Sequence, residues 1–469
     1  MEKRKLNLLY IMTDHQRFDS IGKICKSTTV APNLTVLSRE STFFTRAYDT
    51  CPLCVPARTA LATGIYPTAN HVVYNDWKGK TATRHATLQK ILKDNGYFVG
   101  HVGVDHIRSI PRIEDSGLDF YYSQKDYAQM IESLGIPTAR KKKDSVEVSE
   151  LVDGKLERNQ YSGTNVSEWK YPLYLFKDRC FLDKSLEFLD SCTQSNPFAL
   201  FVCFWAPHPP LTVPEEYLSK FPTSDIVLPS NIGICSKNEP SSFRRGIAAQ
   251  LAKSISKDEW RNVWSAHFAL TNMVDEYIGV LIDKIKSLGL YDDTVIVFTS
   301  DHGDNLGQHS MYQKMEMYEE DIHVPLIIKV PGVKASKPST VVSHLDVVPT
   351  LCDLFGLGKL DPMADGKSLI YEIESGKSRT GMESFAAYSG NPGYGDVRRA
   401  IITDRYKLIV DDACDFALFD LIDDPLEMNN IAHDSQNDEI VKKLYERCMD
   451  YHLNKNDYFE WRCYGRKMD

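Results

Sequence analysis

The sequence predicts an α/β fold, with a large central mixed, mostly parallel sheet sandwiched by helices. Short apolar segments have the composition of buried strands, and they are residues 7–12, 198–205, 294–300 and 324–330. Between them, residues 85–97 and 268–290 carry apolar side chains at helical spacing, and each stretch meets a glycine near its end. Strands that alternate with helices in this way are typical of an α/β sandwich.

The composition changes near residue 375, which predicts a second and smaller unit. Residues 375–395 are rich in glycine, serine and proline, and the chain from 398 onward then reads as strand, turn, strand and turn before a polar helix. We therefore expect a large α/β domain over residues 1–375. A C-terminal subdomain with a short antiparallel sheet and a helix is expected over residues 376–469.

Two polar stretches interrupt the α/β pattern. Residues 137–170 and 219–257 read as insertions on the rim of the fold, where substrate specificity usually lies. The basic run at 140–143 falls in the first of them and is interpreted as a solvated loop. A net charge of −9 argues against a groove for nucleic acid.

Cysteine usage and the N-terminal segment bear on location. The 11 cysteines are scattered and odd in number, which favours reduced thiols in the cytosol over a disulfide framework. The opening residues are basic and then apolar, but the apolar run is short, ends at Asp14 and lacks a small-residue cleavage site. The longest apolar run, 198–207, is too short to span a bilayer. We expect a cytoplasmic protein without a membrane partner.

Carboxylates and imidazoles follow three of the predicted strands. They are Asp14 and His15 after 7–12, His208 after 198–205, and Asp301 and His302 after 294–300. Because functional sites of open α/β sheets lie at the carboxyl ends of strands, these side chains could form a mixed oxygen and nitrogen site for a divalent metal. From spacing alone, helix caps and turns explain the same residues equally well. Taken singly, His106, His309 and Lys314 read as structural or surface residues.

The stretch CPLCVPARTALATG, residues 51–64, predicts an anion site. A zinc or redox interpretation of Cys51 and Cys54 fits poorly, since the chain has no second CxxC. Pro56 suits the first turn of a helix and Gly64 its end, so Cys54 would precede a helix N-terminus. Arg58, one turn on, offers a forked donor for a tetrahedral oxyanion.

Cys54-Val-Pro-Ala-Arg58, continued to Gly64, resembles the C-x-P-x-R signature of type I sulfatases, in the alkaline phosphatase superfamily. The resemblance covers nearly the whole chain, because further blocks match in order. These are residues 7–22, 275–309, 318–332, 343–357 and 404–432. It implies a sulfuric ester hydrolase whose catalytic domain is the 1–375 unit. A small sulfated carbohydrate is the substrate we expect.

The resemblance also implies a cofactor and a set of roles. Cys54 would be oxidised to formylglycine by a sulfatase-maturating enzyme, and the hydrate of that aldehyde would be the nucleophile. One divalent metal, calcium first with manganese or magnesium as alternatives, would be held by Asp14, His15, Cys54, Asp301 and His302. The other catalytic residues would be Arg58, His106, His208 and Lys314.

Departures from the family pattern keep alternatives open. Val104 stands where most members have a sulfate-contacting lysine two residues before His106, and Lys78, Lys80 or Arg108 could replace it. His15 stands where an acidic or amide residue is usual, which softens the site and makes manganese more plausible.

Other hypotheses therefore remain. Phosphonate monoester hydrolases and phosphodiesterases of the family also lack that lysine, and Asn75 sits where they place a substrate-contacting asparagine. Asn75 and His309 are the substrate-binding candidates. A choline sulfatase, a non-catalytic binding protein and a CxxC redox protein are the remaining alternatives.

Overall fold

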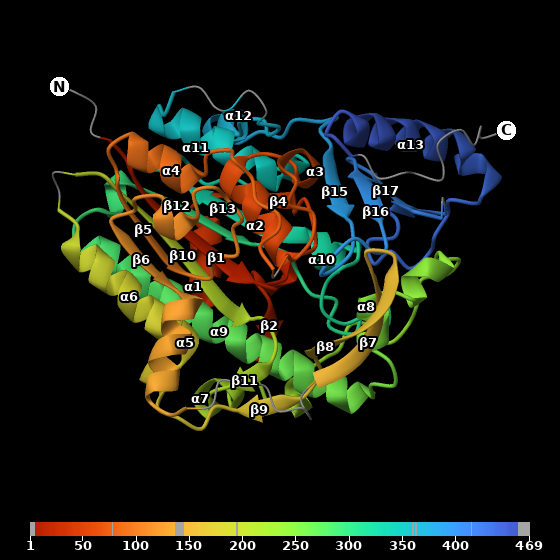
Figure 1. The fold of residues 1–469 in the computed structure, drawn as a ribbon, viewed down its shortest axis with the longest axis horizontal. Helices are drawn as coiled ribbons and strands as arrows, with labels where there is room; N and C mark the ends of the chain where they lie inside the picture. The colour runs from red at the N-terminus through yellow and green to blue at the C-terminus, as the bar shows by residue number, and fades with distance from the viewer. Residues whose placement is uncertain are drawn as a thin grey trace.

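A computed structural model describes residues 5–457 except 77, 137–144, 194–195, 359–360, 362–363 and 414. The basic run at 140–143 thus lies outside the described residues. The larger part of the chain forms an eight-stranded sheet with helices on both faces (Figure 1), which confirms the predicted fold class. The strand order is β14-β4-β13-β12-β1-β10-β5-β6. In that order the strands are Val342–Ser343, Thr42–Tyr48, His323–Lys329, Thr294–Ser300, Asn7–Asp14, Phe198–Pro207, Phe98–Gly103 and Phe120–Ser123.

Within this sheet β13 alone runs against the other strands. It pairs antiparallel with both β12 and β4, whereas the remaining neighbours are parallel. The chain leaves β12 at the carboxyl edge, crosses that edge as a loop and the short helix α10 (Glu319–Ile322), and enters β13 from the same side. This return reverses β13 and leaves residues 301–322 lying over the carboxyl ends of the central strands.

Helices cover the sheet on both sides. In Figure 1, α4 (Leu88–Asp94) and α11 (Val347–Phe355) lie above the strands, and α6 (Lys177–Ser191) and α9 (Lys257–Ser287) lie below them. α9 begins earlier than the predicted 268 because Ser256 caps it. The Ser256 hydroxyl accepts the Glu259 amide hydrogen at 3.2 Å, and the Glu259 carboxylate accepts from the Ser256 amide at 2.8 Å. The remaining helices of this part are α1 (Pro32–Arg39), α2 (Cys54–Thr63), α3 (Pro67–Asn70), α5 (Gln124–Ser133), α7 (Glu215–Leu218), α8 (Ile247–Leu251) and α12 (Ile370–Ser375).

The described part of the first polar insertion folds as a hairpin of β7 (Ser145–Val152) and β8 (Lys155–Ser162). Its tip is tied to a loop of the C-terminal part. The Asp153 amide donates to the Tyr394 carbonyl at 2.7 Å, and the Tyr394 amide donates to the Asp153 carboxylate at 3.1 Å. At Gly395 an added Cβ would collide with the Leu151 carbonyl, so the close approach requires glycine there. Smaller pairings are β2 (Ile24–Cys25) with β3 (Thr28–Thr29), and β9 (Val166–Glu168) with β11 (Leu211–Val213).

The C-terminal part forms the predicted antiparallel sheet and helix. The strands β15 (Ser384–Tyr388), β16 (Arg398–Ile402), β17 (Tyr406–Asp411) and β18 (Phe416–Asp420) pair in sequence order. α13 (Asp438–Leu453) packs on this sheet through its own apolar cluster, which includes Val410, Leu418 and Leu444. The buried ammonium of Lys407 on β17 binds Glu319 of α10 at 3.0 Å and so joins the sheet to the larger part. The division at residue 375 stays a prediction.

Candidate active site

Adjacent parallel strands bring polar residues to one edge of the sheet. β12, β1, β10 and β5 are neighbours, with Thr13 opposite Ser300 and Asp14 opposite Pro207. Asp14 ends β1, and the residues that follow the other three strands are Asp301 and His302, His208, and His106. The register therefore brings these strand-end side chains close together, although the sequence alone did not separate this arrangement from caps and turns.

Helix α2 delivers Cys54 to the same edge. Cys54 is its first residue and is 2% exposed, and the Asn75 side-chain oxygen accepts the amide hydrogen of Val55 at 3.1 Å. The predicted stop at Gly64 is confirmed by its left-handed φ of 70°, whereas the helix begins at Cys54 itself and so includes the residue predicted to precede it. Asn75 is thereby fixed beside the first turn of α2.

The Cys54 sulfur lies among charged and basic groups. It is 2.6 Å from Lys314 Nζ, 3.4 Å from His302 Nε2 and 3.7 Å from Asp14 Oδ1. Burial and the Asp14 carboxylate raise the pKa of the Cys54 thiol to about 12. An unmodified cysteine is therefore held as the weakly reactive thiol at neutral pH.

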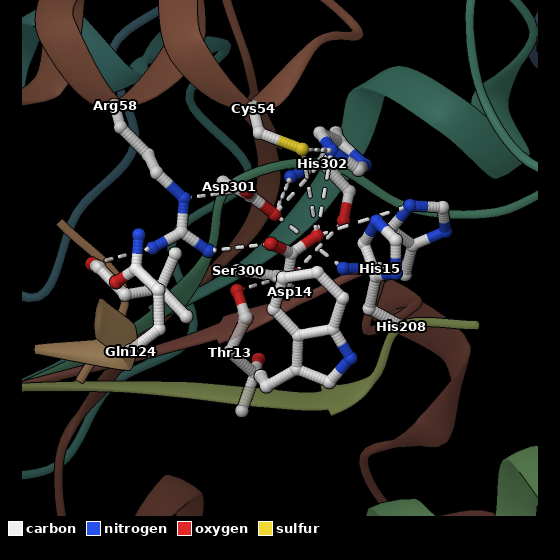
Figure 2. Close-up of polar contacts among 12 residues, drawn as sticks. Thr13, Asp14, His15, Cys54, Arg58, Gln124, His208, Ser300, Asp301 and His302 are labelled. Atoms are coloured by element: carbon white, nitrogen blue, oxygen red, sulfur yellow. Dashed lines mark hydrogen bonds and ion pairs between the residues drawn. The ribbon is translucent and has the colours of Figure 1, made fainter. Parts of the chain in front are cut away.

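Arg58 holds two carboxylates together. Its Nε donates to Asp301 at 2.8 Å and its Nη2 to Asp14 at 2.9 Å, and Nη1 donates to the Val104 carbonyl at 3.2 Å. Figure 2 shows the guanidinium on one side of Asp14 and Asp301, with His15 and His302 on the other. Burial and the Asp301 charge raise the pKa of Asp14 to about 7. Burial opposes ionisation of Asp301 too, but the charge and hydrogen bond of Arg58 outweigh it and lower the pKa of Asp301 to about 2.

Hydrogen bonds orient both imidazoles beside Asp14. His15 Nδ1 donates to the Asp304 carboxylate at 2.7 Å, and His302 Nδ1 donates to the Gly303 carbonyl at 3.0 Å. Their Nε2 atoms accept from Lys314 Nζ at 2.8 Å and 3.0 Å. Burial, followed by the Lys314 charge, holds the pKa of His15 well below its ordinary value, and burial lowers that of His302 to about 3. Both rings are therefore neutral, the form in which histidine binds metals.

The donor atoms suit a divalent cation. Ligand atoms of Asp14, Cys54, Asp301 and His302 lie within 4.8 Å of one another, as do those of Asp14, His15 and His208. Two carboxylates and neutral imidazole nitrogens match the donors that such ions prefer. The five residues predicted as metal ligands thus fall into two overlapping groups that share Asp14. Lys314 Nζ lies among the same atoms, 4.0 Å from Asp14 Oδ1.

A cavity of about 330 Å³ opens onto Cys54. Its lining includes four further residues that the sequence singled out, namely Asn75, His106, His208 and Lys314. Lys314 is 5% exposed and lies in the loop over the sheet edge, not on a helix. Arg58 lies behind the carboxylates and outside this lining. Burial and the Arg58 charge lower the pKa of His106 to about 3.

His309 is not brought to this cavity. It is fully buried in a different cluster, with Nδ1 3.1 Å from the Ser236 hydroxyl and its ring stacked on Tyr318 at 3.7 Å. Glu320 lies 3.3 Å from its Nε2. These partners hold the His309 ring within the packed interior, and the expected contact with substrate finds no support here.

The cations that could replace the missing lysine at position 104 also lie elsewhere. Lys78 and Lys80 are exposed, and Arg108 donates to the Asp76 carbonyl at 3.1 Å. None of these three belongs to the cavity lining. Lys314 is the lysine that the described lining contains.

Asp304 and several residues that line the cavity were not predicted from the sequence. Asp304, which orients His15, lies in the same DHGD segment as Asp301 and could have been inferred from that proximity. Trp205 ends a predicted strand. The missed lining residues are Trp205, Glu150, Asn159, Gln160, Tyr161, Ser162, Gln313, Met315, Asn391 and Pro392. Those from the hairpin lie in a stretch already predicted to carry specificity.

Comparisons with known proteins identify the family of this chain. A family model described as Sulfatase matches residues 6–357, and the model of the N-sulphoglucosamine sulphohydrolase C-terminal region matches residues 307–454. The chain is 27% identical over 466 residues to the uncharacterized sulfatase YidJ of Escherichia coli K12, covering 96% of this chain and 87% of the relative. It is 28% identical over 449 residues to choline-sulfatase of Rhizobium meliloti, covering 92% and 83% respectively.

A solved structure supports the fold. Phosphonate monoester hydrolase from Silicibacter pomeroyi matches with a TM-score of 0.77 and 21% identity, over 97% of this chain and 96% of that one. Within the described residues, no helix is long and apolar enough to cross a membrane. Because the Sulfatase model spans most of the chain, the protein belongs to the type I sulfatase family of the alkaline phosphatase superfamily and is a sulfuric ester hydrolase.

Proposed function

We propose that the protein hydrolyses the sulfate ester of a small carbohydrate, with residue 54 oxidised from cysteine to formylglycine. The position of Cys54 carries this proposal, at the first turn of α2 and in contact with Lys314, His302 and Asp14. A hydrated aldehyde there supplies a hydroxyl nucleophile, and return to the aldehyde releases sulfate. A thiol with a pKa of about 12 offers neither property.

The surrounding side chains bind the sulfate, contact the nucleophile, protonate the leaving alcohol and position the carboxylates. Lys314 supplies a cation for the sulfate oxygens, and His106 on the cavity wall supplies a neutral imidazole for the nucleophile. His208, with its ring 4.3 Å from that of His15, donates a proton to the leaving alcohol. Arg58 acts through Asp14 and Asp301: it holds both in position, and it favours the ionised form of Asp301.

A divalent metal completes the proposed site. Asp14, Asp301, His15, His302 and residue 54 would hold it, with calcium as the first choice and manganese as the alternative that two imidazoles favour. When bound, such an ion supplies Lewis-acid charge for a sulfate oxygen and acidifies a hydroxyl of the nucleophile.

Maturation of residue 54 requires a partner enzyme that oxidises cysteine. Because Cys54 is 2% exposed in the folded chain, the modification acts before α2 packs against the sheet. A sulfatase-maturating enzyme that binds the unfolded 51–64 segment is the partner we expect.

Phosphonate monoester hydrolysis is a second candidate. It is favoured by Val104, whose position carries no cation, and by Asn75 on the cavity wall beside residue 54. A phosphonate monoester carries one negative charge, as a sulfate monoester does, so the single lysine of the described lining can serve either group.

Two measurements test these proposals. Mass spectrometry of the peptide that contains residue 54 should show formylglycine in active protein, and a Cys51–Cys54 disulfide in active protein would refute the mechanism. Parallel assays with aryl sulfate and an aryl phosphonate monoester should show faster sulfate turnover. Faster phosphonate turnover would replace the first candidate with the second.

A further inference from the structure

One wall of the cavity has no part in the proposed chemistry. It is formed by Glu150 on β7, Tyr161 on β8 and Asn391 from the loop between β15 and β16. We call these three residues the polar wall. Glu150 and Asn391 are each 6% exposed, although both line the cavity. The two parts of the chain that carry the polar wall are held together at the hairpin tip by the bonds between Asp153 and Tyr394.

Hydrogen bonds link the three residues of the polar wall in a chain, in which each donor points toward Glu150. The Asn391 side-chain nitrogen donates to the Tyr161 hydroxyl at 2.8 Å, and that hydroxyl donates to Glu150, with oxygen distances of 2.9 Å and 3.1 Å. Asn159 donates to the same carboxylate at 2.7 Å. An ionised carboxylate only accepts hydrogen bonds, so the Tyr161 hydroxyl donates its one hydrogen to Glu150, and its oxygen accepts a hydrogen bond from the Asn391 amide.

This arrangement leaves the polar wall with spare acceptors. A carboxylate can accept about four hydrogen bonds, and those to Glu150 come from Asn159 and the single proton of Tyr161. The Asn391 side-chain oxygen is buried and has no hydrogen-bond partner among the described residues. A buried acceptor without a donor is costly, so the polar wall favours a ligand that brings donors.

We propose that the polar wall binds hydroxyl groups of the alcohol part of the substrate, with Glu150 as the specificity-determining residue, and that it selects sulfated sugars with free hydroxyls. This inference rests on the proposed sulfatase activity and names its substrate class. The sulfate end of the sugar lies at residue 54 and Lys314, and a ring hydroxyl donates to Glu150 and another to the Asn391 oxygen.

The same cavity fits choline sulfate poorly. A trimethylammonium group brings no N–H or O–H donor to the polar wall and is recognised by open aromatic faces. Trp205, the tryptophan in the lining, already has Lys177 Nζ 3.9 Å from its ring centroid and the His208 ring at 4.2 Å. A second cation there would be repelled by the lysine.

Burial makes the charge state of the Glu150 carboxylate depend on the hydrogen-bond donors around it. Desolvation raises its pKa to about 7, against the lowering effect of hydrogen bonds from Asn159 and Tyr161, and with Glu157 and Asp396 as further acidic neighbours. A hydroxyl donor from the substrate replaces part of the water that burial removed, and so stabilises the charged form.

The test compares substrates on one enzyme with formylglycine confirmed by mass spectrometry. Kinetics with D-glucose 6-sulfate, choline sulfate and p-nitrophenyl sulfate are measured for the wild type and for Glu150→Gln and Asn391→Ala. The wild type should prefer the sugar to choline sulfate. In both variants the ratio of kcat/KM for the sugar to that for the aryl sulfate should fall about tenfold or more, mainly through KM.

Glu147→Gln is the matched control, because Glu147 is an exposed glutamate on the same strand. It should keep the wild-type ratio. Equal losses on sugar and aryl sulfate in the Glu150 and Asn391 variants, or a preference for choline sulfate, would overturn this inference while leaving the sulfatase proposal intact. Failure of the wild type on every sulfate ester would overturn the proposed function, and this inference with it.

Discussion

The two sides of the cavity are built differently. On the side that holds Cys54, which we call the chemical side, residues follow the ends of adjacent core strands or begin α2, and the sheet register fixes their spacing. Lys314 joins them from the loop that crosses the sheet edge. The polar wall comes from an inserted hairpin and from a C-terminal loop, joined by a few hydrogen bonds. Under the proposed role of the polar wall, the residues that bind the alcohol are separate from those that the sheet holds in place, so such a fold can change its substrate and keep its reaction.

Removal of the nucleophile should have the largest effect. Cys54→Ala is expected to abolish sulfate hydrolysis, with kcat reduced by about 10⁴-fold or more, because neither an aldehyde nor a thiol remains at the start of α2. Steady-state assays and circular dichroism measure the loss and the retained fold. Cys51→Ala is the control and should keep activity, and equal loss in both variants would instead favour a paired role for the cysteines.

Arg58→Met should damage the chemical side in a second way. It leaves Asp14 and Asp301 as neighbouring buried carboxylates without their shared cation, which should cost about 3–5 kcal/mol of stability as well as activity. Thermal unfolding and kcat are measured together. Glu150→Gln should lower neither to this extent, and a comparable loss of stability there would erase the distinction between the two sides.

Asp304→Asn should show whether the orientation of His15, and not only its presence as a ligand, matters for metal binding. Asp304 fixes His15 through Nδ1, and loss of such a carboxylate typically weakens metal binding about 10–100-fold. Metal content after dialysis should fall, and activity should return when excess metal is added. Persistent inactivity with metal fully bound would contradict this role.

The pH dependence of substrate affinity should show the smallest effect. The pKa of Glu150 is about 7, so its carboxylate becomes an ionised acceptor as pH rises through neutrality. We expect KM for a sulfated sugar to fall severalfold between about pH 6 and pH 8. Glu150→Gln should remove this trend, whereas its persistence in the variant would assign it to another group.

Strand ends and the 51–64 stretch drew attention to residues of the chemical side, but the family resemblance, and not spacing, assigned their roles and added His106 and Lys314. Asp14 and Asp301 stand at the ends of strands that their apolar composition predicts. Cys54 stands at the start of a helix that Pro56 and Gly64 predict. The direction of β13 did not follow from its apolar composition, because it depends on the loop that crosses the sheet edge. His309 shows the limit of such reasoning, since a histidine in a promising segment lies against Ser236 and Tyr318 and outside the cavity lining.

The polar wall was beyond sequence reasoning at the level of residues. Composition identified the stretch at 137–170 as a rim insertion, but no spacing rule relates Glu150 to Asn391. Their proximity depends on how the hairpin tip docks on the C-terminal loop, which is a tertiary contact. Asp304 lay within reach, since it follows Asp301 by three positions in a segment that already carried chemistry.

The bond between Tyr161 and Asn391 joins positions 230 residues apart in the chain. A mutation that reshapes the hairpin therefore loses its benefit unless the distant loop changes with it. A change of substrate alcohol should then require matched substitutions in the hairpin and in the loop that carries Asn391. Grafting the hairpin alone onto a related enzyme should transfer little of the substrate preference. The C-terminal sheet, whose loop carries Asn391, would thus help to determine which substrate binds. Exchanging this sheet together with the hairpin is the way to change the substrate preference of the enzyme.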